Sequence, residues 1–269
     1  RSRGTGSFRG TSDTVDSGNL LVANCRHMQA MPFPEMIMPE NLSHWTARPR
    51  PEHKPIEGRY VVLEPLDPGR HTSGLFEASD VPDGDQKFRW LPEYPPETET
   101  DFRGWVEKAA ASKDPLFFAI VDKETGKVAG RQTLMRIDEA NGVIEIGNIY
   151  WGPLISRRRG ATEALYLFMK YVFDDLGYRR FEWKCNNDNI PSRQAALRFG
   201  FSEEGVFRQH LVVKGLNRDT AWFSMIEKEW PALKKGYEAW LAAENFEPSG
   251  EQKRKLGACL ADAAKSGQS

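Results

Sequence analysis

The alternation of apolar and polar residues divides most of the chain into short strands and amphipathic helices. The predicted strands are residues 60–64, 116–121, 128–135, 143–151, 180–185, 206–213 and 220–226. The predicted helices are residues 70–79, 101–112, a long segment that ends at Gly177, 191–199, 231–243 and 251–264. This order of elements predicts a mixed sheet flanked by helices, in the range from α/β to α+β proteins.

The two ends of the chain differ in pattern from the middle. Residues 1–26 are rich in Gly, Ser, Thr and Arg and lack periodicity, and the following pair, His27-Met28, is typical of a cloning site. We therefore expect a disordered leader left by cloning, with a genuine disordered N-terminus as the alternative. Prolines in residues 28–57 predict an extended lead-in. Residues 58–232 would form the main domain, and residues 233–269 a C-terminal helical extension.

Composition excludes several classes of protein. The chain has 269 residues, of which 39% are hydrophobic, with 8 Trp and 15 Phe. It can therefore build a core and is not wholly disordered. Lys and Arg number 37 and Asp and Glu number 38, so the chain has no overall charge that favours nucleic acid or an anionic membrane. No apolar run approaches the roughly 20 residues that span a bilayer.

The cysteines and histidines predict neither a metal site nor a disulfide framework. The three cysteines lie far apart, and the five histidines are scattered along the chain. A protein of the reducing cytoplasm is the plain expectation.

Residues 143–165, VIEIGNIYWGPLISRRRGATEAL, contain the most informative motif. A strand ends, a short basic loop follows, and a long helix begins, which is how backbone N–H groups are presented to a phosphate. The arginines at 157–159 add positive charge, while Gly160 and Ala161 would let a ligand approach the backbone closely. Thr162 would cap the helix or contact phosphate. A solvated basic loop and an RNA-binding patch are the alternatives.

Several short stretches between residues 143 and 230 resemble the GNAT acetyltransferase superfamily, and within it the RimJ/RimL-like group. They are Glu145-Ile146-Gly147, Thr162-Glu163-Ala164-Leu165, Asn189-Ile190-Pro191-Ser192-Arg193, Gly200-Phe201, Glu204-Gly205-Val206-Phe207-Arg208 and Glu229-Trp230. Each stretch is weak alone, but their order and spacing are specific. A weaker match extends the resemblance to residues 55–232. The resemblance implies the GNAT fold, a splayed and mostly antiparallel seven-stranded sheet flanked by helices.

The resemblance further implies an acetyl-CoA-dependent enzyme without a metal. The diphosphate would lie at the start of the helix, and the pantetheine arm between the strands that end near Trp151 and Cys185. The residues that would contact the coenzyme are Ile149, Tyr150, Trp151, Arg157, Arg158, Arg159, Gly160, Ala161, Thr162, Asn189 and Ser192. In the register fixed by the following helix, Arg159 stands where the family usually has Gly. Arg159 is therefore expected to adopt a conformation typical of Gly.

Acetyl transfer needs a group that accepts the proton of the amine. Glu145 is a single acid within an apolar run, a setting that raises a carboxyl pKa and suits a general base. The alternative is an outward-facing side chain, or a pair with an arginine such as Arg131. The family's usual general-acid Tyr is absent, because its position here is Ala196. Ser192 matches the serine that RimJ/RimL-like enzymes offer instead, with helix capping as its alternative role.

The acceptor pocket is expected among the first helices, the loop at 88–91 and the strands at 206–222. Trp90, Arg131 and Arg208 are the candidates for contacting substrate. The resulting hypothesis is an N-acetyltransferase that moves an acetyl group to a protein N-terminus or a small-molecule amine, by direct attack in a ternary complex. The alternative is a weakly active or inactive CoA-binding regulatory protein. The apolar C-terminal helices would allow a homodimer.

Overall fold

The computed structural model describes residues 40–266 of the chain. Contacts divide the chain into two units, residues 1–45 and residues 46–269. Of the first unit, residues 40–45 are described, and they contain a turn in which the N–H of Trp45 donates to the carbonyl of Leu42 at 2.8 Å. The leader predicted at residues 1–27 lies outside the described residues.

The second unit is built on one eight-stranded sheet in the order β1-β2-β3-β4-β5-β6-β8-β7. Its strands are β1 Ile56–Glu57, β2 Val61–Pro65, β3 Leu116–Asp122, β4 Val128–Asp138, β5 Val143–Trp151, β6 Arg180–Asn186, β7 Ser202–Val213 and β8 Leu216–Ile226. Neighbouring strands are antiparallel except β5 and β6, which are parallel. The two-residue β1 is the strand in excess of the seven predicted.

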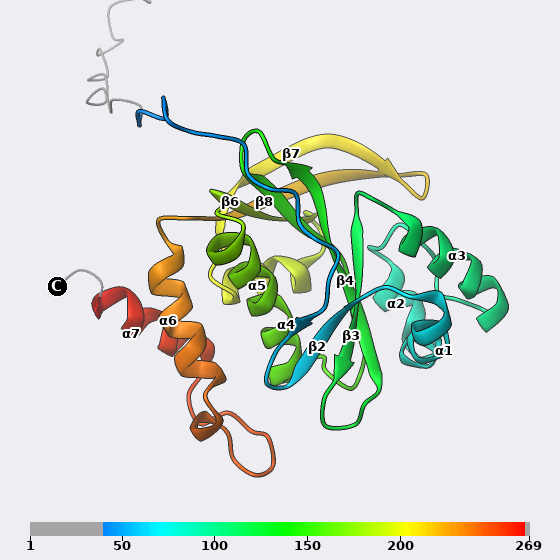
Figure 1. Ribbon diagram of the computed structural model, residues 1–269. Coiled ribbons are helices and arrows are strands. Elements are labelled where there is room, and N and C mark those ends of the chain that lie inside the picture. The colour runs from blue at the N-terminus through cyan, green and yellow to red at the C-terminus, as the bar shows by residue number, and fades with distance from the viewer. Residues whose placement is uncertain (1–39, 267–269) are drawn as a thin grey trace, which may run out of the picture. The chain divides into compact units, whose positions relative to one another are not determined.

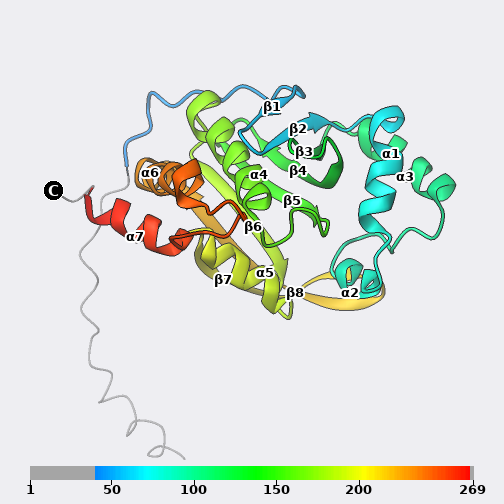
Figure 2. The ribbon, with the colours of Figure 1, turned by 90° about the horizontal axis from the view of Figure 1, so that it is seen from below.

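The helices lie on both faces of this sheet (Figures 1 and 2). They are α1 Pro68–Ser79, α2 Gly84–Phe88, α3 Glu99–Ala111, α4 Arg159–Lys170, α5 Ile190–Arg198, α6 Trp230–Leu241 and α7 Leu256–Ser266. A π-helical turn, Tyr171–Asp175, continues α4, and a 3-10 turn, Ala243–Asn245, follows α6. The five-residue α2 was not predicted, since it is too short to show an apolar periodicity.

The alternating side chains of β3 show how the sheet serves two hydrophobic cores. Leu116, Phe118 and Ile120 join the larger core, which includes residues of α4 and α6. Phe117 and Ala119 point to the other face and pack with Phe102, Val106 and other residues of α1 and α3. Successive side chains of a strand point to opposite faces, so β3 is apolar at nearly every position because both of its faces are covered.

The hairpin β7–β8 is longer than the sequence predicted. β7 begins at Ser202 and β8 at Leu216, four residues earlier than expected in each case, and the turn is reduced to Lys214-Gly215. Nearly all of β7 is exposed. The extra residues therefore show no alternation of apolar and polar side chains. A prediction based on that alternation cannot detect that they belong to strands.

A buried carboxylate of α4 holds the start of β2. Glu163 is 4% exposed and accepts hydrogen bonds from the backbone N–H groups of Arg59, Tyr60 and Val61 at 2.8, 2.6 and 2.8 Å. Gly58 allows this approach, because a Cβ there would lie 2.6 Å from the Glu163 carboxylate. Three charge-assisted hydrogen bonds thus fix α4 against the sheet.

We predict that Glu163→Ala lowers the free energy of unfolding by about 3 kcal/mol, since it leaves three backbone donors without an acceptor. Urea denaturation followed by circular dichroism measures this change. Glu107→Ala, at an exposed position of α3, is the matched control and should change stability by less than about 0.5 kcal/mol. Equal stabilities of the two variants would contradict the role given to Glu163.

Candidate functional site

The parallel strands β5 and β6 separate partway along their length. Their ladder runs from Val143–Arg180 to Ile146–Trp183 and includes no later pair. Beyond this point β5 stays paired with β4 as far as Trp151, and β6 stays paired with β8 as far as Asn186. The two facing edges therefore retain backbone donors and acceptors that neither strand uses for the other.

A β-bulge in β5 lies where the strands separate. Between the pairs Arg131–Tyr150 and Thr133–Gly147, β5 has one residue more than β4. The bulge contains Asn148, which has a φ of 47°. Its carbonyl accepts a hydrogen bond from the Arg131 guanidinium at 3.0 Å. A bulge bends and twists its strand, so it directs β5 away from β6.

Arg131, predicted to contact substrate, is instead buried in protein contacts. It is 1% exposed, forms an ion pair with Glu93 and lies 4.4 Å from the centre of the Trp105 ring. Burial lowers its pKa to about 9, which still leaves the guanidinium charged at neutral pH. Arg131 therefore connects the segment after α2 to the bulge of β5, a role that its sequence position in an apolar strand did not reveal.

The other two predicted substrate residues lie nearer the surface. Trp90 follows α2, is partly exposed and lies 4.7 Å from the Arg89 guanidinium, and Arg208 is exposed on β7. The regions expected to form the acceptor pocket do meet. Lys214, in the β7–β8 turn, donates to the carbonyl of Phe88 at 3.0 Å. Their contact with substrate stays a prediction.

A cavity of about 930 Å³ contains most of the residues predicted to bind coenzyme. It is lined by the end of β5, by Trp183 of β6, by the start of α4, by α5, and by the segment between α6 and α7. The predicted residues on its wall are Ile149, Tyr150, Trp151, Arg157, Arg158, Arg159, Ala161, Thr162, Asn189 and Ser192. The structure thus brings together side chains from two segments that are about thirty residues apart.

Gly160 is not on the cavity wall, contrary to the expectation that it gives a ligand access to the backbone. A Cβ at Gly160 would lie 2.9 Å from Cγ2 of Ile155 and 3.2 Å from Cγ1 of Val61. The absent side chain therefore allows α4 to pack closely on the protein interior. Glycine is required here for packing, and the sequence pattern alone could not separate the two reasons.

The backbone of the basic loop differs from the expected register. Arg157 has a φ of 60°, whereas Arg159 is the first residue of α4. The prediction that Arg159 takes a glycine-like conformation is therefore wrong, and Arg157 takes it. Arg158 is the N-cap and makes no side-chain capping bond, so Thr162 does not cap the helix. The first N–H groups of α4 have no side-chain acceptor at the cap position.

The arginines next to this helix start differ in their contacts. Arg159 lies 3.6 Å from Glu124 and 4.3 Å from the centre of the Tyr60 ring. Within residues 40–266, Arg157 and Arg158 form no ion pair and no side-chain hydrogen bond. An uncapped helix N-terminus beside two guanidinium groups without carboxylate partners is a site suited to an anion.

Glu145 lies on β5, on the opposite face from its neighbours Ile144 and Ile146, which belong to the core. The residue is 4% exposed, and its carboxylate lies 3.0 Å from both Lys184 Nζ and Arg136 Nε. Burial raises its pKa, and the two cations only partly oppose this effect. Glu145 is thus a buried carboxyl with a raised pKa, and its partners are not the Arg131 that the sequence suggested.

Lys184 was not singled out from the sequence. It is held between Glu145 at 3.0 Å and Glu182 at 2.7 Å, and it lies 3.9 Å from the centre of the Trp222 ring. Alternation along β6 is the signal that could have found it, because Lys184 lies on the face opposite the apolar Phe181 and Trp183.

Ser192 and Asn189 lie at the start of α5. The Asn189 side chain caps this helix by accepting from the N–H of Ser192 at 3.2 Å. The Ser192 hydroxyl accepts from Trp183 Nε1 at 3.0 Å and also lies next to Cys185, whose thiol pKa is raised by burial. Asn189 therefore has the capping role, and the bond between Ser192 and Trp183 does not use the hydroxyl proton of Ser192.

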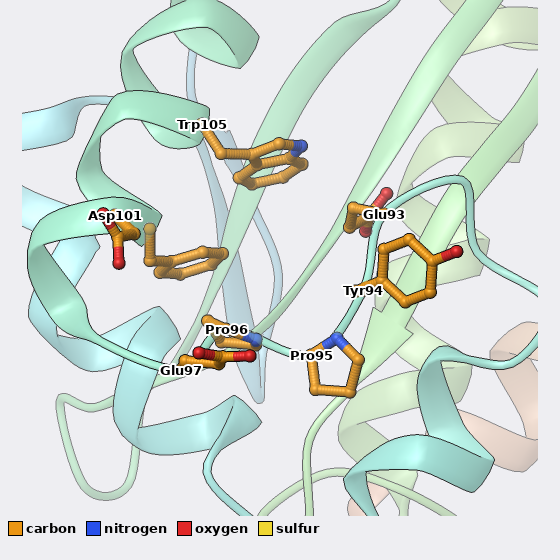
Figure 3. A pocket seen from close by; sticks show the side chains of 8 residues that line it. Glu93, Tyr94, Pro95, Pro96, Glu97, Asp101 and Trp105 are labelled. Atoms are coloured by element: carbon orange, nitrogen blue, oxygen red, sulfur yellow. The ribbon is translucent and has the colours of Figure 1, made fainter.

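A smaller pocket of about 260 Å³ lies on the α3 side of the sheet (Figure 3). Its lining residues are Glu93, Tyr94, Pro95, Pro96, Glu97, Asp101, Phe102 and Trp105. It shares none of these residues with the larger cavity. Carboxylates and aromatic rings make its lining suited to a cationic group.

Two further properties of the described residues concern membranes and metals. Within residues 40–266, no helix combines the length and apolar character that crossing a bilayer requires. In the same part of the chain, no three His, Cys, Asp or Glu side chains gather so that they could hold a metal ion.

The fold and the site define a class of protein: a mixed sheet whose central parallel strands separate, with a helix N-terminus beside the gap. A family model described as an acetyltransferase (GNAT) domain matches residues 61–202, more than half of the chain. The chain therefore belongs to the GNAT acetyltransferase family. A solved GCN5-related N-acetyltransferase from Brucella melitensis is 64% identical, with a TM-score of 0.80 over 81% of this chain and 99% of that chain.

Curated relatives match a smaller region. The uncharacterized N-acetyltransferase p20 of Bacillus licheniformis is 32% identical over 117 residues, or 42% of this chain and 63% of p20. YdaF of Bacillus subtilis, whose name provisionally assigns it to ribosomal N-acetyltransferases, is 32% identical over 110 residues, or 40% of this chain and 59% of YdaF. The chain thus matches less than two thirds of their length. The likeness to YdaF agrees with the RimJ/RimL-like group indicated by the sequence.

We predict that Arg131→Met lowers the free energy of unfolding by about 3 kcal/mol, because it leaves the Glu93 carboxylate without its partner. In the double variant Arg131→Met/Glu93→Gln, part of this loss should be recovered. Urea denaturation of the wild type, both single variants and the double variant gives the coupling energy. Strictly additive effects would show that the ion pair does not hold the two segments together.

Proposed function

We propose that the protein transfers the acetyl group of acetyl-CoA to a primary amine, by direct attack in a ternary complex. One observation carries this proposal: a single cavity joins the uncapped N-terminus of α4 to the unpaired end of β5 and to Trp183, the last residue of β6 that pairs with β5. Acetyltransferases of this family use acetyl-CoA. Its anionic diphosphate and its amide-containing arm match the chemistry of these two regions.

The diphosphate is assigned to the start of α4. There the helix dipole and the unpartnered guanidinium groups of Arg157 and Arg158 favour negative charge. The amides of the pantetheine arm are assigned to the backbone edges of β5 and β6 beyond Ile146 and Trp183. Hydrogen bonds with this arm would satisfy groups that the separation of the strands leaves open.

The transfer requires three changes at the reacting atoms. The amine nitrogen attacks the thioester carbonyl carbon, the carbon–sulfur bond breaks, and the nitrogen loses a proton. We assign Glu145 as the base that accepts this proton, directly or through water, because its raised pKa brings it closer to neutral pH. We assign Ser192 as the donor to the leaving thiolate, since its hydroxyl proton is not used in its bond with Trp183.

The acceptor is assigned to the face of the sheet opposite α4, where Glu145 lies. A protein N-terminus and a small-molecule amine both fit the RimJ/RimL-like group. The carboxylates and aromatic rings of the smaller pocket support an acceptor that carries additional positive charge (Figure 3). A panel of N-terminal peptides, polyamines and uncharged primary amines therefore tests which class of amine is accepted.

The proposal predicts release of free thiol when the protein is mixed with acetyl-CoA and a suitable amine. We expect release to need both compounds, and mass spectrometry should find one acetyl group on the amine. Binding of CoA with no thiol release from any amine would support the alternative, a CoA-binding regulatory protein. Absence of CoA binding, together with tight and salt-dependent RNA binding, would support the RNA patch instead.

We predict that Glu145→Gln lowers kcat about 100-fold while the Kd for acetyl-CoA stays unchanged, because the amide cannot accept the proton. In the wild type, kcat should fall with decreasing pH through the raised pKa of Glu145, since the base works only when it is deprotonated. The decline in kcat should therefore occur at a higher pH than the titration of an ordinary glutamate. It should be absent in the variant. Steady-state kinetics over a range of pH measures kcat and its pH dependence, and calorimetry measures the Kd for acetyl-CoA.

Glu182→Gln is the matched control for this experiment. Glu182 faces Glu145 in the β5–β6 register and contacts the same Lys184. Its substitution disturbs the ion cluster without removing the proposed base. Equal losses of kcat in the two variants, or a normal kcat in Glu145→Gln, would remove Glu145 from the mechanism.

A further inference from the structure

Part of the wall of the larger cavity is formed by residues that lie beyond the matched family domain. The wall includes Trp240 of α6 and residues of the segment 246–255, which we name the closing loop. This loop connects the 3-10 turn Ala243–Asn245 to α7. It lies on the same side of the sheet as α4 and α5 (Figures 1 and 2). The C-terminal extension is therefore part of the wall of the candidate coenzyme site.

The closing loop is fixed by a network of hydrogen bonds. Asn245 is the centre of this network: its side chain donates to the carbonyls of Trp240 and Arg254 at 2.9 and 3.2 Å and accepts from the N–H of Arg254 at 2.9 Å. The Trp240 indole donates to Gln252 at 2.9 Å, and Phe246 forms a β-bridge with Gln252. The loop is thus a built structure with defined side-chain positions.

An aromatic contact joins the closing loop to the start of α4. The Phe246 ring lies 5.1 Å from the Trp240 ring and 6.0 Å from the Tyr60 ring, measured between centroids. The Arg159 guanidinium lies 5.6 Å from the Phe246 ring centre. The loop and the proposed diphosphate site are therefore neighbouring parts of one cavity wall.

The cavity wall is strongly basic. Its basic residues are Lys87, Arg157, Arg158, Arg159, Arg198, Lys253 and Lys255, and its single carboxylate is Glu251. Lys255 has no ion pair within residues 40–266. Lys253 lies 4.0 Å from Glu247, and both of these side chains are about half exposed, so their attraction is weak.

Five of these seven basic residues form two groups, the arginines 157–159 at the start of α4 and Lys253 with Lys255 on the closing loop, while Lys87 belongs to α2 and Arg198 to α5. Coenzyme A likewise has two anionic groups, its diphosphate and the 3′-phosphate of its ribose. We propose that the closing loop binds the ribose 3′-phosphate through Lys253 and Lys255. This inference rests on the proposed function, and it makes the C-terminal extension responsible for preferring CoA over coenzymes without that phosphate.

The test compares CoA with 3′-dephospho-CoA by calorimetry on the full chain. We expect the wild type to bind CoA about ten times more tightly than 3′-dephospho-CoA. In Lys253→Ala/Lys255→Ala, the affinity for CoA should fall about tenfold and the affinity for 3′-dephospho-CoA should stay the same. The ratio of the two dissociation constants would then approach about one.

Two further variants separate this effect from general charge effects. Lys235→Ala/Lys265→Ala removes two exposed lysines of the same extension that do not line the cavity, and it should keep the wild-type ratio. Arg157→Ala/Arg158→Ala should weaken both ligands equally, because both contain the diphosphate. Thermal unfolding of each variant checks that the fold is intact.

The possible failures are distinguishable. If the wild type binds neither ligand, the proposed function fails. If it binds both equally, or if Lys253→Ala/Lys255→Ala weakens both by the same factor, the coenzyme assignment stands and the role of the closing loop is overturned.

Discussion

The separation of β5 and β6 is the constraint on which the site depends. Each strand is paired with another neighbour, β5 with β4 and β6 with β8. The facing edges of β5 and β6 therefore do not pair with each other beyond Ile146 and Trp183. The bulge at Asn148 supplies the change of direction, and the buried Arg131 holds its carbonyl. A gap with unused backbone groups is costly unless water or a ligand satisfies them. The fold therefore preserves a place for an extended polar ligand.

The same separation determines where the proposed anion site lies. β5 leaves the sheet at Trp151, and a turn of seven residues leads directly to Arg159 at the start of α4. The helix N-terminus thus opens next to the gap, and the three backbone hydrogen bonds that Glu163 accepts fix the position of α4 relative to β2. The arginines of the loop and the unpaired end of β5 become parts of one cavity because a single short connection joins the strand to the helix.

The two faces of the sheet have different proposed roles. Ile144 and Ile146 pack with α4, whereas Glu145, between them, lies on the other face with Lys184 and Arg136. Coenzyme binding is assigned to the helix side and proton transfer to the opposite side, with the gap in the sheet as the passage between them. One strand can serve both sides because its side chains alternate.

The sequence by itself determined the elements whose apolar spacing is strong, β5, α4 and β6 among them, and the basic loop between the first two. It also indicated Glu145 as an acid among apolar residues. These properties are local, since they depend on residues within one strand or one or two helical turns. The sequence missed α2 and the full length of β7, because a very short helix and an exposed strand have no periodic apolar pattern.

Only the tertiary structure decided which distant residues meet. Four features depend on segments that are far apart in the chain. They are the partners of Arg131, the partners of Glu145, the interior packing of Gly160 and the contribution of the closing loop to the cavity wall. Arg131 and its partner Glu93, for example, are separated by 38 residues. Such contacts depend on how strands and helices pack, and a basic or acidic residue has the same letter whether it is buried in an ion pair or free to bind a ligand. Burial and partner choice are properties of the folded chain, so they could be measured in the structure but not inferred from spacing.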